Sequence, residues 1–388
     1  MNSRPLYLKG NIKINNEDEY IIGKIIKNSN VEEKYNFIQV LTKDNMSFFQ
    51  EGYKGYIFEE FPGSLKSIGG NFCYDVKDIN TLINYDVVEI VNNRYIKVLY
   101  RDDSEDNIIL TTNQCNSNCI MCPDSDGVRK TKFNPSINKL LEQVECIPND
   151  TAHITITGGE PGMLKDDFIL LLNKCKQCLP NTEFLLLTNG RIFSSIEYTT
   201  KFLKNAPSKI RVGIPLYADN RELHDSITRV EGSFEQTVVG IKRLLKNNID
   251  VEIRIVVLKK NYKELENITK FIIREMPSIK YLNIMALEMS GNAYINKKEV
   301  WVGFEEVRPY LNEACLIAVN AGITTNLYNF PLCFIDRKLY SLCKKSITDY
   351  KIRYKEECEN CILKHNCGGF FNSTINEKNI IVNPIMEN

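Results

Sequence analysis

The sequence of 388 residues is poor in histidine and has no excess of either charge. With only His153, His224 and His365, we do not expect a metal site or a catalytic triad built on histidine. Lys plus Arg and Asp plus Glu both number 49. No global field therefore favours nucleic acid or an anionic membrane as a partner, and we expect neither.

Long apolar runs are also missing. No segment approaches the roughly 20 apolar residues of a membrane-spanning helix, and the first residues, Met-Asn-Ser-Arg-Pro, lack the apolar core of a secretion signal. Hydrophobic residues still make up 43% of the chain, enough to build cores in two or three domains. We expect a soluble, cytoplasmic protein.

Cysteine, in contrast, is abundant: the chain has 13, and many are clustered. In a large chain without a secretion signal, this usage indicates metal or redox chemistry rather than a disulfide scaffold.

Three cysteines follow a predicted strand with the spacing C-x₃-C-x₂-C: Cys115, Cys119 and Cys122. Iron–sulfur clusters are held by cysteine thiolates, usually four. Three thiolates on one loop therefore predict a [4Fe–4S] cluster with one iron open to a small chelating molecule. Structural zinc, which requires four ligands, and inert thiols are the alternatives.

The pattern of the chain predicts three regions. Residues 1–106 show short β-rich runs and predict a mostly β domain, either a structural appendage or a platform for a peptide or partner. Residues 107–326 alternate strands and helices in six βα units, too few for a complete eight-fold barrel. Residues 327–388 form a small cysteine-rich extension. The expected strands of the middle region are 108–112, 153–157, 183–188, 209–215, 251–258 and 281–286, and the expected helices are 137–145, 166–178, 196–205, 234–246, 262–275 and 304–321.

The segment Thr157-Gly158-Gly159-Glu160 follows the second expected strand. Two glycines allow a backbone path closed to other residues and let a ligand approach closely. Together with the cysteine spacing, this segment resembles the radical SAM superfamily. The resemblance implies an α/β fold, namely a partial (β/α)₆ TIM-like barrel. It also implies that S-adenosylmethionine (SAM) binds to the open iron of the cluster. It also implies that the Gly-Gly-Glu loop grips the SAM amino group, and that the cluster at Cys115, Cys119 and Cys122 splits SAM to a 5′-deoxyadenosyl radical.

The resemblance implies further contacts. Residues His224, Asp225 and Arg229 with Gly232-Ser233-Phe234 resemble the family's "HD…R…GSF" linker. Met121 stands where an aromatic residue usually shields the adenine, and methionine supplies a polarizable contact instead. The other implied cofactor-binding positions are Asn189 in a common family turn, Tyr217 near the ribose or substrate, Arg254 at the SAM carboxylate and Met289 behind the adenine.

Five cysteines lie near the C-terminus: Cys333, Cys343, Cys358, Cys361 and Cys367. Their spacing resembles the SPASM or twitch extension, which holds auxiliary iron–sulfur clusters. Five thiols suffice for one four-ligand [4Fe–4S] cluster, not for two. We favour Cys333 as the upstream ligand that joins the last three, because it follows a strand-like run, and Cys343 is the alternative. Zinc at the same thiolates is the second hypothesis.

Three phrases resemble the His-Xaa-Ser system radical SAM maturases: Phe330-Pro331-Leu332-Cys333, residues 346–351, and 367–373. The resemblance implies a maturase of a ribosomally made precursor peptide, which abstracts a hydrogen and then forms a cross-link or oxidises the residue. It implies a second radical SAM protein as partner and a reductant such as flavodoxin or ferredoxin. The alternatives are a maturase of a protein substrate like the sulfatase-activating enzymes, a dehydrogenase of a small molecule, and a zinc-bearing binding module without catalysis.

Overall fold

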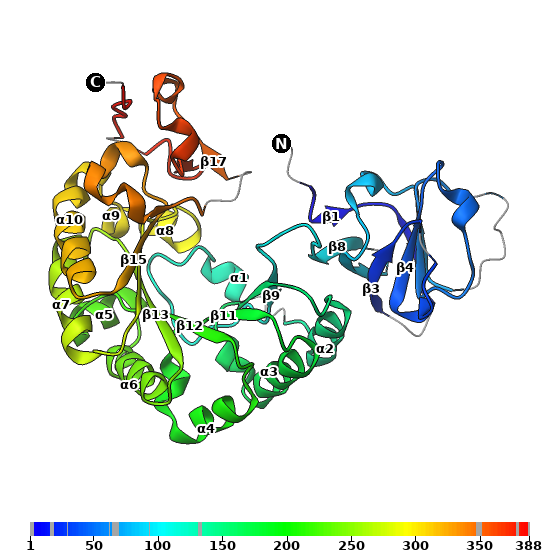
Figure 1. The fold of residues 1–388 in the computed structure, drawn as a ribbon, viewed down its shortest axis with the longest axis horizontal. Helices are drawn as coiled ribbons and strands as arrows, with labels where there is room; N and C mark the ends of the chain where they lie inside the picture. Colours follow the sequence, from blue (N-terminus) through cyan, green and yellow to red (C-terminus); the bar gives the residue numbers. More distant parts are fainter. Residues whose placement is uncertain are drawn as a thin grey trace.

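The computed structural model of the chain contains two large β-sheets and a small C-terminal region (Figure 1). It describes residues 4–15, 19–28, 30–61, 63, 70–92, 94–130, 134–346, 351–377 and 380–386. The predicted α/β class is confirmed, with a parallel sheet in the middle of the chain and β structure before it.

The middle sheet is parallel throughout, and its strands follow one another in chain order. Helices cover its outer face and leave the inner face open, so that the layers form a crescent (Figure 1). The strands are β9 (Ile108–Leu110), β10 (His153–Thr157), β11 (Glu183–Leu187), β12 (Ile210–Pro215), β13 (Asp250–Val256), β14 (Tyr281–Met285), β15 (Thr324–Tyr328) and β16 (Cys343–Lys344). The covering helices are α2 (Ile137–Cys146), α3 (Asp166–Cys178), α4 (Ile196–Asn205), α6 (Ser233–Lys246), α7 (Leu265–Glu275) and α10 (Phe304–Asn320).

All six expected strands and six expected helices of this region are present, with ends shifted by a few residues. Strands β15 and β16 extend the sheet beyond residue 326. Within the described residues, four short α-helices lie in the loops: α1 (Asp126–Lys130), α5 (Arg221–Thr228), α8 (Gly291–Ile295) and α9 (Lys297–Val300).

The two faces of the sheet differ in chemistry, as β13 illustrates. Val251, Ile253 and Ile255 are at most 1% exposed because they point to the helices. Glu252 and Arg254, on the alternate positions, point to the inner face. This alternation leaves polar groups inside the crescent, where a complete barrel would have a packed core.

The N-terminal sheet is mixed and has the order β1-β8-β7-β3-β4-β5-β6-β2. Its edge strands β1 and β2 are separated by only Lys9 and Gly10, so the sheet curls until its two edges meet. A Cβ on Gly10 would lie 2.6 Å from a methyl group of Val76, which explains the glycine at this closure. The strands are β1 (Tyr7–Leu8), β2 (Asn11–Lys13), β3 (Tyr20–Ile26), β4 (Phe37–Leu41), β5 (Gly55–Phe58), β6 (Phe72–Tyr74), β7 (Val87–Val91) and β8 (Tyr95–Tyr100).

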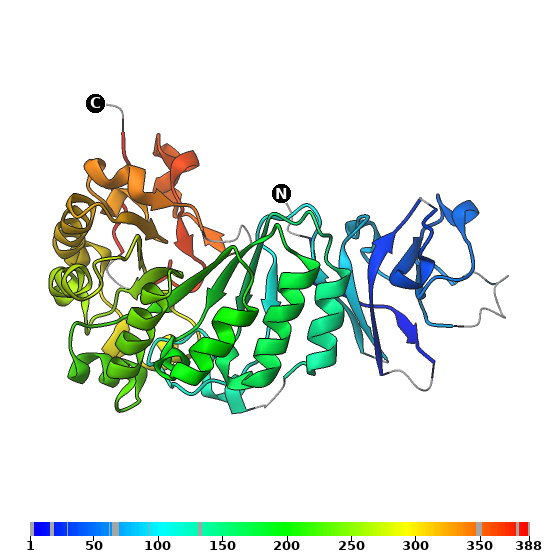
Figure 2. The same ribbon diagram turned by 60° about the horizontal axis from the view of Figure 1, so that its bottom comes forward.

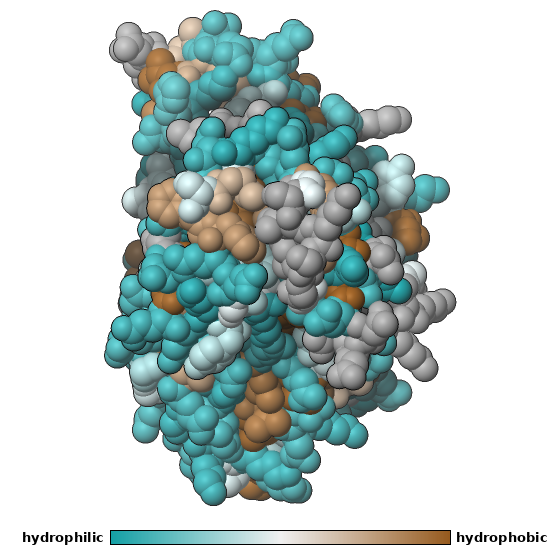
Figure 3. Space-filling model, turned by 90° about the vertical axis from the view of Figure 1, so that its right-hand side faces the viewer, coloured by the Kyte–Doolittle hydropathy of each residue, from teal (hydrophilic) through white to brown (hydrophobic). Residues whose placement is uncertain are grey.

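This sheet packs on α2, at the β9 end of the crescent. The Tyr100 hydroxyl is 2.9 Å from Thr151 Oγ1, and Lys139 Nζ is 2.7 Å from Glu89 Oε1. Both views place the N-terminal sheet at one end of the molecule and the C-terminal region at the other (Figures 1 and 2). On the face shown in Figure 3, hydrophilic side chains predominate and the apolar ones form separate spots.

The C-terminal region lies beside β15 and β16. Its short strands β17 (Ile352–Arg353) and β18 (Phe370–Phe371) pair antiparallel. The Thr374 hydroxyl is 3.3 Å from the Met289 amide, which ties this region to the loop after β14. Residues 347–350, part of one phrase of the maturase resemblance, lie outside the described residues. None of the described helices has the length and hydropathy that crossing a bilayer requires.

Candidate functional site

A cavity of about 1400 Å³, including its open mouth, lies on the inner face of the parallel sheet. Its walls come from the loops at the carboxyl ends of the strands, the edge at which α/β barrels carry their active sites. The structure brings ten of the residues expected to hold the cluster or SAM into these walls, together with His224, while Glu160 and Met289 lie outside them. The ten are Cys115, Cys119, Met121, Cys122, Thr157, Gly158, Gly159, Asn189, Tyr217 and Arg254.

The loop with the three cysteines is held from two sides. The Asn118 amide donates to the Thr228 carbonyl at 3.0 Å, where α5 ends. The Asn292 amide, in α8, donates to the Cys122 carbonyl at 2.9 Å. Backbone hydrogen bonds beside Cys119 and at Cys122 thus hold the loop against α5 and α8, which the local sequence alone could not do.

The three thiols lie in a shielded environment. Burial raises the pKa of Cys115 to about 11 and that of Cys119 to about 12, and it also raises the pKa of Cys122. Iron binds the thiolate and displaces the thiol proton. Because their pKa is raised, these thiols are expected to lose their protons only when the metal binds. The Ser117 amide lies 3.4 Å from Cys115 Sγ, and N–H···S contacts of this kind tune iron–sulfur clusters. The donor set fits a cluster.

The arrangement of the possible donor side chains also bears on the alternative of a single zinc ion. Among the described residues, no three Cys, His, Asp or Glu side chains come close enough to share one metal ion. A single zinc ion requires all its ligands within roughly 2.0–2.3 Å. A cluster instead spreads its thiolates over several irons. The trio on the cysteine loop is also one thiol short of the four ligands that structural zinc requires.

Gly158 and Gly159 have a steric role. A Cβ on Gly159 would lie 2.3 Å from the Gln114 carbonyl oxygen, and one on Gly158 would lie 2.6 Å from that of Thr112. The Gly159 amide donates to the Thr112 oxygen at 2.6 Å. The glycines thus allow the cysteine loop to lie directly against the loop after β10. Glycine is therefore required here because the two loops approach closely, and not because the backbone is left-handed.

Glu160 is 1% exposed and faces away from the cavity. Its carboxylate accepts from the Thr188 hydroxyl at 2.6 Å, the Asn189 amide at 2.6 Å and the Gly162 amide at 3.0 Å. Burial raises the pKa of Glu160, although these three hydrogen bonds oppose the shift. In this geometry Glu160 joins the loops after β10 and β11 and positions Asn189 in the cavity wall.

One wall of the cavity is apolar. Met121, Tyr217 and Met289 belong to a single hydrophobic cluster, and Met121 is 4% exposed. Burial, followed by the nearby cysteine thiols, raises the pKa of Tyr217 well above its usual range. The Tyr217 ring therefore lies beside the trio, while Met289 lies behind the wall.

Arg254 points into the cavity, and its charge already has a partner. Its Nη1 is 2.6 Å from Glu252 Oε1, two residues earlier on the same face of β13. Its Nη2 lies 3.4 Å from Met285 Sδ. An incoming carboxylate would have to share Arg254 with Glu252.

Other cavity residues escaped the sequence analysis or received no role in it. Arg129 donates to the Ser117 carbonyl at 2.6 Å, and Arg191 donates to the Asn116 carbonyl at 2.7 Å. Both side chains line the cavity and place positive charge beside the cysteine loop. No local pattern marks these arginines, because α1 and the loop after β11 meet the cysteines only in the folded chain.

The second cysteine group surrounds a separate pocket of about 350 Å³. Cys333, Cys358, Cys361 and Cys367 line it, whereas Cys343 does not. Burial and the three neighbouring thiols raise the pKa of Cys333 to about 12. Cys343 instead lies 3.7 Å from the Leu339 carbonyl oxygen. The structure thus brings together the four thiols favoured from the sequence.

Two amides point at one sulfur of this group. Leu332 N and Gly369 N each lie 3.4 Å from Cys367 Sγ. These contacts stabilise negative charge on the sulfur, as in iron–sulfur sites. The residues fit an auxiliary cluster.

Strand β18 separates the two sites. Phe370 lines the C-terminal pocket, and Phe371, the next residue, lines the large cavity. Successive side chains of a strand point to opposite faces. A two-residue strand thus forms one wall for each cysteine site.

A partial parallel barrel with three cysteines on the loop after its first strand defines the class of the protein. The sequence profile of the Radical SAM superfamily matches residues 109–272. Residues 109–272 therefore form a radical SAM domain, and such a domain implies a [4Fe–4S] cluster and SAM as cofactors.

Relatives with assigned roles differ in what they do. The chain is similar to a probable GTP 3′,8-cyclase of Sulfurisphaera tokodaii, with 26% identity over 44% of this chain and 52% of that protein. It is also similar to the antilisterial bacteriocin subtilosin biosynthesis protein AlbA of Bacillus subtilis, with 30% identity over 41% of this chain and 34% of that protein. The chain thus spans about half or less of these two relatives. Among solved structures, Streptococcus suis SuiB superposes with a TM-score of 0.46 and 14% identity, over 68% of this chain and 56% of that one.

Proposed function

We propose that the chain matures a ribosomally made precursor peptide by radical chemistry. When bound, the cluster and SAM supply one-electron cleavage of SAM and removal of a hydrogen atom from an unactivated substrate carbon. Cys115, Cys119 and Cys122 hold the cluster, and the loop at Gly158 and Gly159 borders the place for SAM. A cross-link or another oxidation of the peptide follows.

One observation carries this proposal: the auxiliary cysteine site adjoins the cavity across a single strand. Oxidation of the peptide requires that an electron be removed from it, and a cluster behind β18 would be a nearby electron acceptor. Phe371, on the cavity side, offers an apolar contact to a substrate side chain. Relatedness to the subtilosin biosynthesis protein supports a peptide substrate.

The chain's own residues exclude water and position the ligands. Met121 and Tyr217, both almost fully buried, form the apolar wall beside the trio. Glu160 fixes the Asn189 loop from behind, and Arg129 and Arg191 stabilise the cysteine loop. The protein thus orients the cofactor and limits side reactions, while the cofactor carries the difficult chemistry.

The partners follow from the same chemistry. A cluster that must be reduced by one electron requires a donor, for which flavodoxin or ferredoxin is suitable, and an oxygen-sensitive cluster suits the reducing cytoplasm. The short phrases shared with His-Xaa-Ser maturases favour a second radical SAM protein as partner. The N-terminal sheet, remote from the C-terminal region, is proposed as a platform for the peptide.

Nucleotide cyclisation is the second candidate, because relatives include GTP 3′,8-cyclases. A triphosphate requires several uncommitted cationic groups. Arg254 is paired with Glu252, whereas Arg129 and Arg191 donate to neutral backbone carbonyls and keep their charge. The peptide stays the first candidate because of the auxiliary cysteine site and the relatedness to the subtilosin biosynthesis protein.

Anaerobic reconstitution tests the proposal. We expect about eight irons per chain, as for two [4Fe–4S] clusters, and formation of 5′-deoxyadenosine under a strong reductant. A short peptide encoded beside the gene should change in mass, while GTP should remain unchanged. Colourless protein that contains zinc, or consumption of GTP, would contradict the proposal.

A further inference from the structure

His224 lies in the cavity wall, and only one of its ring nitrogens has a partner. The side chain is 1% exposed and packs between the rings of Tyr217 and Phe234, with centroid distances of 5.5 and 5.6 Å. It lines the cavity, and in the described part of the chain its Nε2 has no hydrogen-bond partner. Buried polar atoms are nearly always paired because an unpaired one costs free energy. Because the ring of His224 lines the cavity, a ligand that packs against this ring is a candidate partner for Nε2.

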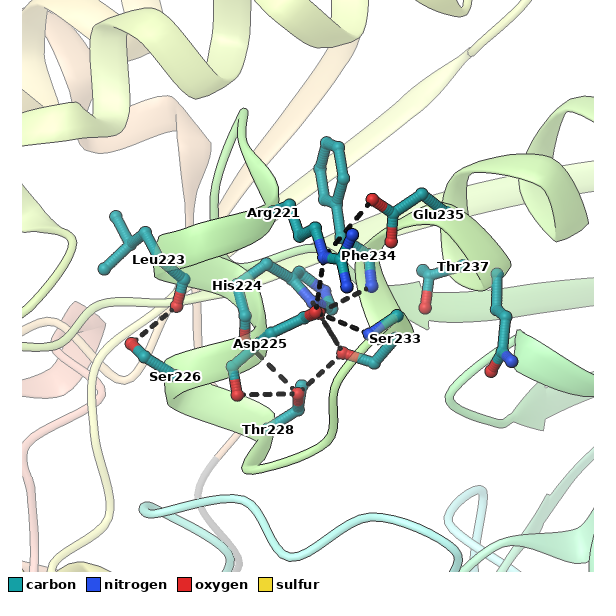
Figure 4. A network of polar contacts seen from close by, with 12 residues as sticks. Arg221, Leu223, His224, Asp225, Ser226, Thr228, Ser233, Phe234, Glu235 and Thr237 are labelled. Atoms are coloured by element: carbon teal, nitrogen blue, oxygen red, sulfur yellow. Dashed lines mark hydrogen bonds and ion pairs between the residues drawn. The ribbon is translucent and has the colours of Figure 1, made fainter.

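A hydrogen-bond network fixes the other nitrogen (Figure 4). Nδ1 is 3.1 Å from Ser233 Oγ, and Ser233 Oγ donates to Asp225 Oδ1 at 2.7 Å. Since the single hydroxyl hydrogen of Ser233 goes to the carboxylate, the strongest acceptor present, the serine oxygen accepts from Nδ1–H. The lone pair of the imidazole is therefore on Nε2.

The carboxylate at the end of this network is itself held by the backbone. Asp225 Oδ2 accepts from the Gly232 amide at 2.6 Å, and Oδ1 accepts from the Phe234 amide at 2.9 Å. Hydrogen bonds from Ser233 and these amides lower the pKa of Asp225 despite its partial burial. The turn before α6 thus keeps the acid ionised and orients the histidine ring.

We infer that His224 Nε2 accepts a hydrogen bond from an N–H or O–H group of the ligand bound in the cavity. The inference rests on the proposed function, since two ligands could supply that group. The adenosyl part of SAM has ribose hydroxyls and an amino group, and the peptide has amides and hydroxyls. Asp225 and Ser233 are positioning residues that hold the imidazole in the accepting tautomer.

Two binding measurements on the reconstituted enzyme test the inference and distinguish the sources. His224→Phe keeps a planar ring and removes the acceptor. We expect the variant to bind one of the two ligands about 2- to 12-fold more weakly, which corresponds to the loss of one hydrogen bond. The dissociation constant of SAM is measured by anaerobic equilibrium dialysis, and the KM of the peptide by mass spectrometry. A change in the first constant assigns the donor to SAM, and a change in the second assigns it to the peptide.

Matched variants exclude a general loss of structure. His153→Phe makes the same change at a histidine of β10 that does not line the cavity, and should alter neither constant. His224→Gln retains an acceptor and should restore part of the affinity. Ser233→Ala keeps the imidazole but frees Nδ1, and should weaken the same ligand to a smaller degree.

If His224→Phe does not fold, His224→Gln and Ser233→Ala provide the test through the same two constants. Constants within twofold of the unaltered enzyme in every folded variant would overturn the inference and leave the proposed function intact. Failure of the unaltered enzyme to assemble its cluster or to bind SAM would overturn the proposed function and the inference with it.

Discussion

The two cysteine sites differ in the number of thiols and in the space around them. Cys115, Cys119 and Cys122 stand on one loop at the edge of a cavity of about 1400 Å³. Of the four C-terminal thiols, Cys358, Cys361 and Cys367 lie within ten residues and Cys333 lies further upstream, and together they line a pocket of about 350 Å³. Three donors beside a large space leave room for a chelating molecule, while four donors in a small pocket enclose what they bind. Under the proposed function, the same ligand chemistry would serve SAM cleavage at one site and electron transfer or structure at the other.

Loss of a thiol from the trio should have the largest effect. With Cys119→Ala, two ligands cannot hold the cluster, so iron should fall from about eight to about four per chain and 5′-deoxyadenosine formation should stop. Iron and sulfide assays with product chromatography measure both. Cys178→Ala, at the end of α3 and outside both sites, should behave like the unaltered chain. Cleavage of SAM by the Cys119 variant would remove the catalytic role of this loop.

Loss of thiols from the C-terminal group should separate the two sites. Cys358→Ala with Cys361→Ala should retain about four irons and SAM cleavage and lose the modified peptide, because only the auxiliary cluster is removed. Cys343→Ala, outside the pocket, should keep about eight irons and full product. Unchanged peptide modification in the double variant would show that the auxiliary site is not required.

A change at Gly159 tests how the trio is held. In Gly159→Ala the new methyl group would lie 2.3 Å from the Gln114 oxygen, which should cost about 1–3 kcal/mol and displace the cysteine loop. We expect lower iron content and a lower unfolding midpoint in urea. Gly303→Ala, whose Cβ would meet only the flexible Glu306 side chain at 3.4 Å, is the control. Equal stability of the two variants would contradict the proposed contact.

Acid should destabilise the part of the fold around His224. Burial lowers its pKa from 6.5 to about 4, so between these pH values the unfolded chain binds the proton more readily. The stability that this residue contributes is complete above pH 6.5 and is lost as the pH falls toward the lower value, by about 2 kcal/mol at pH 5. Urea unfolding of the cluster-free chain at pH 7 and pH 5 measures it. The His224→Phe variant should lose less stability between pH 7 and pH 5, because it lacks this contribution. An equal loss of stability in the variant and in the unaltered chain would refute the assignment of the effect to His224.

Phe371 should give the smallest effect. Phe371→Ala removes an apolar contact on the cavity side of β18 and should raise the KM for the peptide by about 2- to 10-fold, with iron content unchanged. Phe370→Ala, on the other face, should instead disturb the auxiliary cluster. If the two substitutions had the same effect, β18 would not separate the sites as the structure indicates.

Sequence reasoning recovered the parallel sheet and its helices because their patterns are periodic and local. The expected strands did not include β15, which is polar, or β16, which has only two residues. Of the residues expected in the site, Glu160 is buried and hydrogen-bonded to the Thr188 hydroxyl and the Asn189 amide. Its sequence neighbours could not show this, because its partners Thr188 and Asn189 belong to the next βα unit.

The sequence alone determined the cysteine chemistry, since the spacing of thiolates on one loop is a local property of the chain. It also determined the order of the strands, because βα units follow one another along a parallel sheet. Only the tertiary structure decided which four C-terminal thiols share a pocket and that Arg129, Arg191 and His224 face the cavity. These groups come from separate elements, and their distances are set by packing between elements rather than by spacing along the chain.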